Sequence, residues 1–124
     1  MELAHVAICV SDLKRALDFY SELGFDERHR FTLDGVENVY IAADDEDGAL
    51  QLRYDPDRST PIAPSRADHD HVAFTVADVE DTFETAIDAG GATVLEPTEI
   101  EPANAYAAFV EDPEGYTLEF YRSA

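Results

Sequence analysis

The sequence predicts an α+β protein made of two tandem βαβββ modules, whose strands form a cupped mixed β-sheet with the helices on its outer face. The first observation is a repeat, because residues 4–13 (AHVAICVSDL) and 70–79 (DHVAFTVADV) share a His-Val-Ala opening and a later Val-x-Asp. Both stretches alternate apolar residues as a strand does, and both then change to helical spacing. Three further strand-like segments follow each predicted helix. We therefore expect one domain, 1–124, with module 1 at 1–55, a linker at 56–68 and module 2 at 69–124.

Local signals set the predicted boundaries of the first module. Ser11 or Asp12 can cap a helix, and Gly24 can end it in a left-handed conformation. Asp34-Gly35 is a strong hairpin signal. The acidic run 44–47 is expected to be a solvated loop. The predicted strands are 2–10, 25–31, 36–42 and 49–54.

The second module shows the same order of signals. Asp78 opens the predicted helix and Gly90-Gly91 stops it, while residues 112–115 (DPEG) predict a turn. Residues 96–104, which contain two prolines, are expected to form a loop. The predicted strands are 70–77, 92–95, 106–110 and 116–121.

Composition excludes several classes of partner. The chain has 28 acidic and 8 basic residues and a formal net charge of -20. Such a field repels nucleic acids and anionic membranes, and it is typical of a solvated acidic surface in a halophilic protein that needs salt to fold. We find no apolar run long enough for a membrane span and no secretory signal pattern. A single Cys rules out an internal disulfide, so a cytoplasmic location is expected.

The strand faces predict a site. Alternation gives each sheet one apolar face, and the other face carries His, Ala, Cys, Gln, Arg, Thr and Tyr with a single acid. In a chain this acidic, that composition indicates a half-enclosed concave surface. Its imidazoles, amide oxygen and carboxylate form a nitrogen and oxygen ligand set without thiolate, which suits a divalent Ni, Co, Zn, Mn or Fe ion. The first and last strands of the two modules supply the four candidates: His5, Gln51, His71 and Glu119.

The paired modules, the His-Val-Ala openings and residues 109–120 (FVEDPEGYTLEF) resemble the vicinal oxygen chelate superfamily. Glyoxalase I, bleomycin-resistance proteins, methylmalonyl-CoA epimerase and extradiol dioxygenases belong to that superfamily. The resemblance implies a glyoxalase-like fold, metal ligands at His5, Gln51, His71 and Glu119, and a homodimer whose sites are completed across the interface. It also implies that Glu119 is the proton acceptor.

The function implied by the resemblance is a metal-dependent lyase or isomerase of the lactoylglutathione lyase (glyoxalase I) type. It would act on a small 2-oxo or hemithioacetal substrate through a metal-chelated enediolate. Arg53 and Glu37 are candidate substrate contacts, and Glu37 is also a weaker candidate base. The bacterial glyoxalase I pattern usually has Glu at position 51, Arg at position 9 and Asn at position 55, where this chain has Gln51, Cys9 and Asp55. A thiol other than glutathione therefore remains open.

Three alternatives stay open at this point. His-Gln-His-Glu is the ligand set of the epimerase type, although the 112–116 segment and the short chain favour glyoxalase I. A bleomycin-resistance type of small-molecule binding protein would need no metal. An Fe(II) dioxygenase could use His5, His71 and Glu119 as a facial triad, but such enzymes are usually longer.

Overall fold

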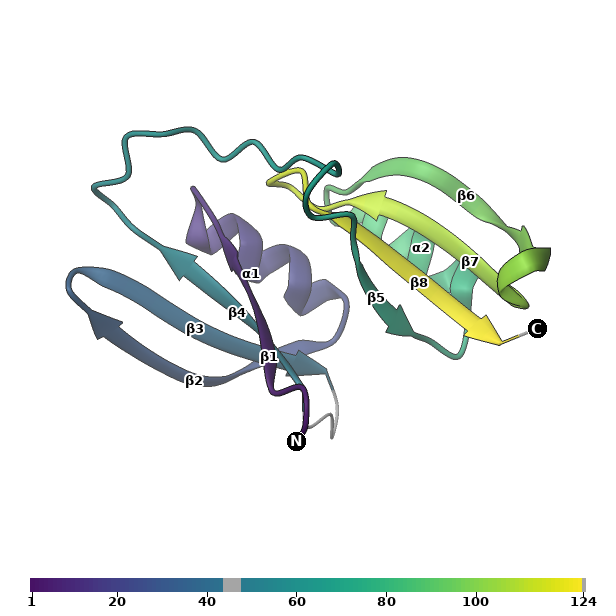
Figure 1. Cartoon of the computed structure of the whole chain (residues 1–124), viewed down its shortest axis with the longest axis horizontal. Coiled ribbons are helices and arrows are strands. Elements are labelled where there is room, and N and C mark those ends of the chain that lie inside the picture. Colours follow the sequence, from purple (N-terminus) through teal and green to yellow (C-terminus); the bar gives the residue numbers. More distant parts are fainter. Residues whose placement is uncertain (44–47, 124) are drawn as a thin grey trace. The chain divides into compact units, whose positions relative to one another are not determined.

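A computed structural model describes residues 1–43 and 48–123, and the predicted acidic loop at 44–47 lies outside the described residues. The chain divides into two compact units, Met1–Ile62 and Ala63–Ala124, and the division falls inside the predicted linker. Each unit has the order β-α-β-β-β and a four-stranded mixed sheet with one helix on one face (Figure 1). The predicted βαβββ modules are thus confirmed, and each unit is described by itself below.

Unit 1 contains one parallel and two antiparallel strand pairs. Its sheet has the order β1-β4-β3-β2, with β1 parallel to β4. The elements are β1 (His5–Cys9), α1 (Leu13–Glu22), β2 (Phe25–Leu33), β3 (Val36–Ala43) and β4 (Ala49–Tyr54).

The predicted turn and cap residues of unit 1 are confirmed. Asp12 is the N-cap of α1, and its Oδ1 accepts a hydrogen bond from the Arg15 amide at 3.0 Å. Gly24, with φ +92°, follows the end of α1 in the left-handed region, where a side chain would be strained. Asp34 and Gly35 both have positive φ, as a two-residue type I′ hairpin requires.

The helix-facing side of the unit 1 sheet forms the core. Alternate residues of β1, β3 and β4 are almost completely buried there, together with Ala16, Phe19 and Tyr20 of α1. These strand residues are Ile8, Val39, Ile41, Leu50 and Leu52. Burying this side leaves the other face of the same strands available for a site.

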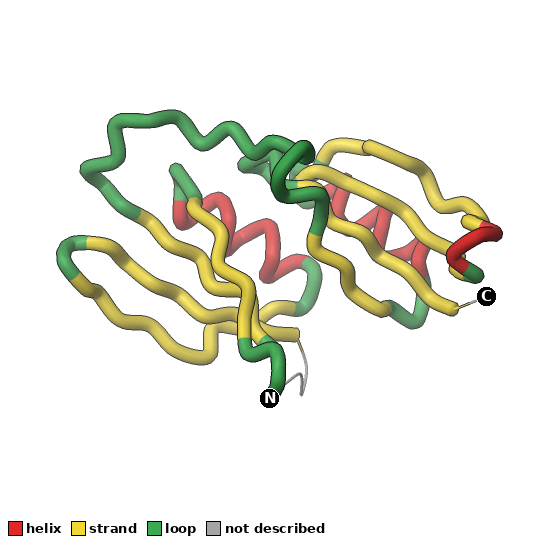
Figure 2. The backbone as a smooth tube through the Cα atoms, viewed as in Figure 1, coloured by secondary structure: helices red, strands yellow, loops and turns green. Residues whose placement is uncertain are grey.

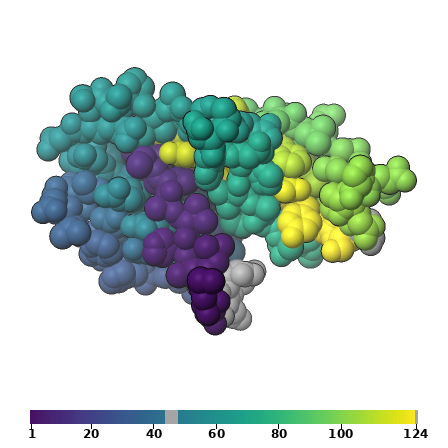
Figure 3. Space-filling model, viewed as in Figure 1, coloured from purple at the N-terminus to yellow at the C-terminus, as the bar shows by residue number. Residues whose placement is uncertain are grey.

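Unit 2 repeats the topology, with the order β5-β8-β7-β6 and β5 parallel to β8. Residues 55–71, which connect the units, form turns and loop and lie at the surface (Figures 2 and 3). The elements are β5 (Val72–Thr75), α2 (Val79–Asp88), β6 (Ala92–Ile100), the 3₁₀ helix η1 (Glu101–Ala103), β7 (Ala105–Glu111) and β8 (Thr117–Ser123).

Two strand predictions in unit 2 need correction. β5 is shorter than predicted, so His71 precedes the strand instead of lying within it. β6 continues to Ile100, although residues 96–104 were expected to form a loop. Pro97 is tolerated because β6 is the last strand in the sheet order and its register with β7 shifts between Leu95 and Thr98.

The predicted 112–115 turn holds the start of β8. Asp112 is only 4% exposed, and its Oδ1 accepts hydrogen bonds from the amides of Glu114 (3.0 Å) and Tyr116 (2.9 Å). The Gly115 amide closes the turn on the Asp112 carbonyl, and Gly115 has φ +100°. One carboxylate therefore satisfies two backbone donors immediately before the strand that carries Glu119.

Acidic side chains are almost all at the surface of the part of the chain that is described. There, Asp112 and Glu114 are the only Asp or Glu residues that are buried. α1 and α2 have ten residues each, and no helix within residues 1–43 and 48–123 is long and apolar enough to cross a bilayer.

Asp112→Ala should destabilise the protein, because it removes the acceptor of two amides in a buried turn. We expect the free energy of unfolding to fall by about 1–3 kcal/mol, measured by urea denaturation. Asp112→Asn keeps an acceptor oxygen and should cost clearly less. Equal losses for the two variants would contradict this account of the turn.

Salt should stabilise the fold, because it screens the mutual repulsion of surface carboxylates. Raising KCl from about 0.1 M to about 1 M shortens the Debye length from about 10 Å to about 3 Å, and we expect the melting temperature to rise. Replacing Glu84 and Asp88 on α2 by Gln and Asn should reduce this dependence. A melting temperature that stays constant or falls with KCl would be inconsistent with a repulsive acidic surface.

Candidate functional site

The register of unit 1 places His5 and Gln51 on one face of the sheet. On neighbouring strands, Gln51 lies opposite Ala7 of β1 and Tyr40 of β3. His5 is two residues from Ala7 and shares its face, while the neighbours of Gln51 in β4, Leu50 and Leu52, point to the core. Both candidates therefore lie on the face turned away from α1.

Asn38 fixes the orientation of the Gln51 amide. Gln51 is 8% exposed, and its Nε2 donates to Asn38 Oδ1 at 2.8 Å. The same oxygen accepts from Arg53 Nε at 3.3 Å, and Asn38 Nδ2 donates to the Val36 carbonyl at 3.0 Å. Arginine can only donate and a carbonyl can only accept, so both contacts assign the same Asn38 orientation. Gln51 must then use its nitrogen toward Asn38, which leaves its Oε1 as the atom that can bind a cation.

The His5 ring reaches across β4. It packs edge-on against Tyr40 of β3, with a centroid distance of 5.2 Å, and β4 lies between β1 and β3. Tyr40 also contacts the rings of His29 and Phe31. The His5 ring thus lies against one member of an aromatic cluster, on the same face as Gln51.

Unit 2 brings His71 and Glu119 into direct contact. Glu119 of β8 lies opposite Ala73 of β5 and Phe109 of β7, on the face away from the buried Leu118 and Phe120. His71 Nε2 is 3.1 Å from Glu119 Oε1, and their side chains are 32% and 16% exposed. The His71 ring packs edge-on against Phe109 at 5.4 Å. Two of the four predicted ligands are therefore neighbours within one unit.

A carboxylate also lies on the other side of the imidazole. His71 Nδ1 is 2.7 Å from Asp70 Oδ1, which in turn accepts from Arg66 at 2.9 Å. These hydrogen bonds, that from Arg66 first, lower the pKa of the Asp70 carboxyl below its usual value, so the group is ionised near neutral pH.

The His71–Glu119 pair is compatible with one shared cation. Two ligand atoms bonded to zinc at about 2.0–2.1 Å lie about 2.9 Å apart at a right angle and about 3.3 Å apart at a tetrahedral angle. The observed 3.1 Å falls between these values. Among residues 1–43 and 48–123, no three His, Cys, Asp or Glu side chains gather in a metal-binding group. Unit 2 by itself therefore offers two neighbouring ligand atoms, His71 Nε2 and Glu119 Oε1.

The two candidate substrate contacts differ in placement. Arg53 is exposed and shares the face of Gln51, where it contacts Asn38. Glu37 lies opposite Tyr54, so it is on the other face, and its carboxylate pairs with Arg30 at 3.4 Å. The structure thus does not bring Glu37 to the face that carries Gln51.

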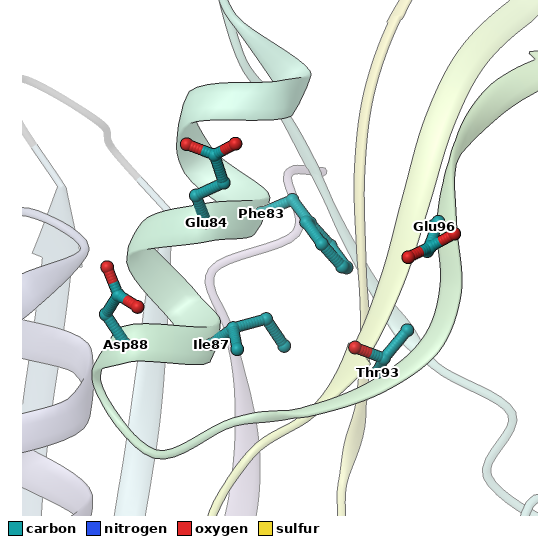
Figure 4. Close-up of a pocket in the computed structure, with 6 residues that line it drawn as sticks. All are labelled: Phe83, Glu84, Ile87, Asp88, Thr93 and Glu96. Carbon is teal, nitrogen blue, oxygen red and sulfur yellow. The ribbon is translucent and has the colours of Figure 1, made fainter.

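A separate hollow of about 430 Å³ lies between α2 and β6 (Figure 4). Phe83 and Ile87 of α2 point toward the sheet there, and Glu96 and Thr93 line the β6 side. This hollow is on the helix-covered face of unit 2, opposite to the face of His71 and Glu119. We assign it no part in the site.

Sequence reasoning missed two supporting residues, Asn38 and Asp70. Asp70 was visible as an acid directly before a candidate histidine. Asn38 lies two residues before Tyr40 in β3 and so shares its face. That Asn38 contacts Gln51 could be recognised only from the register between β3 and β4.

With this geometry in place, comparison with known proteins identifies the class. The chain belongs to the Glyoxalase/Bleomycin resistance protein/Dioxygenase superfamily, whose profile matches residues 2–120.

Particular relatives point to one branch of this superfamily. Curated relatives named lactoylglutathione lyase or probable lactoylglutathione lyase are 22% to 30% identical to the chain. The Haemophilus influenzae lactoylglutathione lyase is 26% identical over 97% of this chain and 91% of its own length. These values establish distant homology.

Solved structures support the fold. A glyoxylase/bleomycin resistance protein/dioxygenase domain from Frankia sp. EAN1pec has a TM-score of 0.83 at 20% identity, covering 100% of this chain and 98% of its own. Glyoxalase I from Zea mays has a TM-score of 0.80 at 23% identity. The match covers 98% of this chain but only 45% of the maize chain.

The contact between Gln51 and Asn38 should be measurable as a coupling energy. Asn38→Ala leaves a buried amide nitrogen unpaired and should lower the free energy of unfolding by about 1–3 kcal/mol. In a Gln51→Ala background, Asn38→Ala should lower the free energy of unfolding by a smaller amount. A double-mutant cycle by urea denaturation measures the difference; strictly additive losses would contradict the proposed amide orientation.

Proposed function

We propose that this protein is a metal-dependent lyase or isomerase of the glyoxalase I type, acting on a small 2-oxo or hemithioacetal substrate. The observation that carries the proposal is the 3.1 Å contact between His71 Nε2 and Glu119 Oε1. His71 and Glu119 of unit 2 occupy the positions that correspond, in the repeat, to His5 and Gln51 of unit 1. Homology to lactoylglutathione lyases supports the same reaction class.

His5, Gln51, His71 and Glu119 would hold a divalent cation. When bound, the cation supplies Lewis acidity, which makes the C–H bond next to a chelated carbonyl acidic and stabilises the resulting negative charge. Three neutral ligands and one carboxylate carry a total charge of -1, so they leave part of the cation's charge for substrate oxygens. The hydrogen bond to Asn38 keeps the Gln51 Oε1 available.

Glu119 is proposed as both ligand and proton acceptor. It is 16% exposed, and a carboxylate that lies beside a bound substrate can remove a proton from one carbon and return it to its neighbour. Arg53 would bind an anionic group of the substrate, because the hydrogen bond to Asn38 uses only its Nε and leaves four N–H donors on the guanidinium. The thiol that forms the hemithioacetal stays open, since Cys9 and Asp55 depart from the glutathione-binding pattern.

We further propose a homodimer. Each unit carries two of the four ligands, and the matched maize glyoxalase I chain is about twice as long as this one. Two copies of this chain would therefore correspond to one maize chain. A site could be completed within one chain or between two copies.

An epimerase is the second candidate. The observation that favours it is Gln51, whose amide is held as a neutral oxygen ligand where a glyoxalase I of the bacterial type usually has Glu. Solvent-deuterium exchange at the α carbon of a thioester, without hemithioacetal turnover, would support the epimerase. Protein that binds no divalent metal would favour a binding function of the bleomycin-resistance type.

Glu119→Gln should abolish most of the activity. We expect kcat/KM for hemithioacetal turnover, assayed with Ni²⁺, Co²⁺ or Zn²⁺ and several thiols, to fall at least about 100-fold because the base is lost. Metal content should fall in parallel.

Glu84→Gln on α2 is the matched control, since it removes the same charge from an exposed helix position, and its activity should equal that of the wild type. If Glu119→Gln and wild type turn over equally, Glu119 takes no part in the mechanism.

A further inference from the structure

We propose that Asp70, held by Arg66, is a positioning residue for His71. It would select the tautomer with the proton on Nδ1, so that Nε2 faces Glu119 without a proton. This inference rests on the proposed function for its purpose, although the tautomer itself can be measured without any metal.

The contacts form a continuous chain of four side chains. Arg66 donates to Asp70 Oδ1 at 2.9 Å, and the same oxygen lies 2.7 Å from His71 Nδ1. His71 Nε2 then lies 3.1 Å from Glu119 Oε1. Because both neighbours of Asp70 use one oxygen, Arg66 fixes the position of the oxygen that meets the imidazole.

Two carboxylates compete for one ring proton. A neutral imidazole has a single N–H, so it can donate to Asp70 or to Glu119 but not to both. The contact with Asp70 is 0.4 Å shorter, at 2.7 against 3.1 Å. We therefore place the proton on Nδ1, where a carboxylate acceptor makes the stronger hydrogen bond.

The result is a pair of acceptors facing each other. Without its proton, Nε2 offers a lone pair to Glu119 Oε1, which also offers lone pairs, so the contact lacks a positive charge between its atoms. A metal cation meets this need, as a second ring proton also would, and ligand histidines in metalloproteins characteristically donate their second N–H to a carboxylate or carbonyl. Packing of the ring against Phe109 at 5.4 Å further restricts its rotation.

The repeat shows that this arrangement belongs to the second module only. The residue before His5 is Ala4, which offers no side-chain acceptor, and the His5 ring packs edge-on against Tyr40. The two candidate histidines thus have different neighbours. A carboxylate, that of Asp70, contacts the ring of His71, whereas the ring of His5 packs against Tyr40.

The ¹⁵N NMR spectrum of the histidine rings tests the tautomer directly in metal-free protein at alkaline pH, where the imidazole is neutral. His71→Gln assigns the signal. We expect the proton on Nδ1 in the wild type and in Asp68→Ala, which removes an exposed acid two residues away.

Two variants of Asp70 separate the hydrogen bond from the charge. Asp70→Ala should move the proton to Nε2, toward Glu119. Asp70→Asn removes the same charge but keeps an acceptor oxygen, which Arg66 orients, so it should retain the Nδ1 proton. A wild-type proton on Nε2, or no change in Asp70→Ala, would overturn the proposal.

Zn²⁺ affinity, measured by calorimetry on the same variants, tests the purpose. Asp70→Ala should weaken binding about 10- to 100-fold, as losing the partner of a ligand histidine does, and Asp70→Asn should restore most of it. Unchanged affinity in Asp70→Ala would overturn the positioning role. If the tautomer shifts as expected but wild type binds no divalent metal, the proposed function fails while the tautomer assignment holds.

Discussion

The contact between His71 Nε2 and Glu119 Oε1 is the interaction on which the interpretation of this molecule depends. With its ring proton on Nδ1 toward Asp70, as we propose, the His71 imidazole presents a lone pair to the Glu119 carboxylate, which also presents lone pairs, at 3.1 Å. Two such acceptors repel each other unless a proton or a metal cation lies between them. The parallel pairing of β5 with β8 places Glu119 beside the start of β5, and the Asp112 turn holds the beginning of β8. The fold thus keeps two acceptors together on one face.

Strand alternation explains why the same units can be both stable and functional. One face of each sheet packs a helix, with Leu52 and Leu118 at most 1% exposed. The other face does not pack against a helix, so it can carry polar groups. These groups need hydrogen-bond partners when they are buried. In unit 1, Asn38 meets this need for Gln51 and at the same time orients its amide. In unit 1, the residue that satisfies the buried Gln51 amide is therefore also the one that orients this candidate ligand.

Much of the fold could be predicted because its signals are local. The caps at Asp12 and Asp78 and the positive-φ residues after each helix depend only on neighbouring positions. β6 was predicted too short, because pairing with β7 outweighs the presence of Pro97. The candidate ligands could be predicted because alternation along a strand shows which residues share a face. The placement of Glu37 required the register itself, since a shift of one residue moves a side chain to the other face.

X-ray absorption spectroscopy of the Zn²⁺- or Ni²⁺-loaded protein would test the central claim most directly. We predict a first shell of nitrogen and oxygen atoms only, with the multiple scattering of two imidazoles, from His5 and His71. A sulfur neighbour at about 2.3 Å, which could come only from Cys9 or Met1, or a single imidazole, would contradict it.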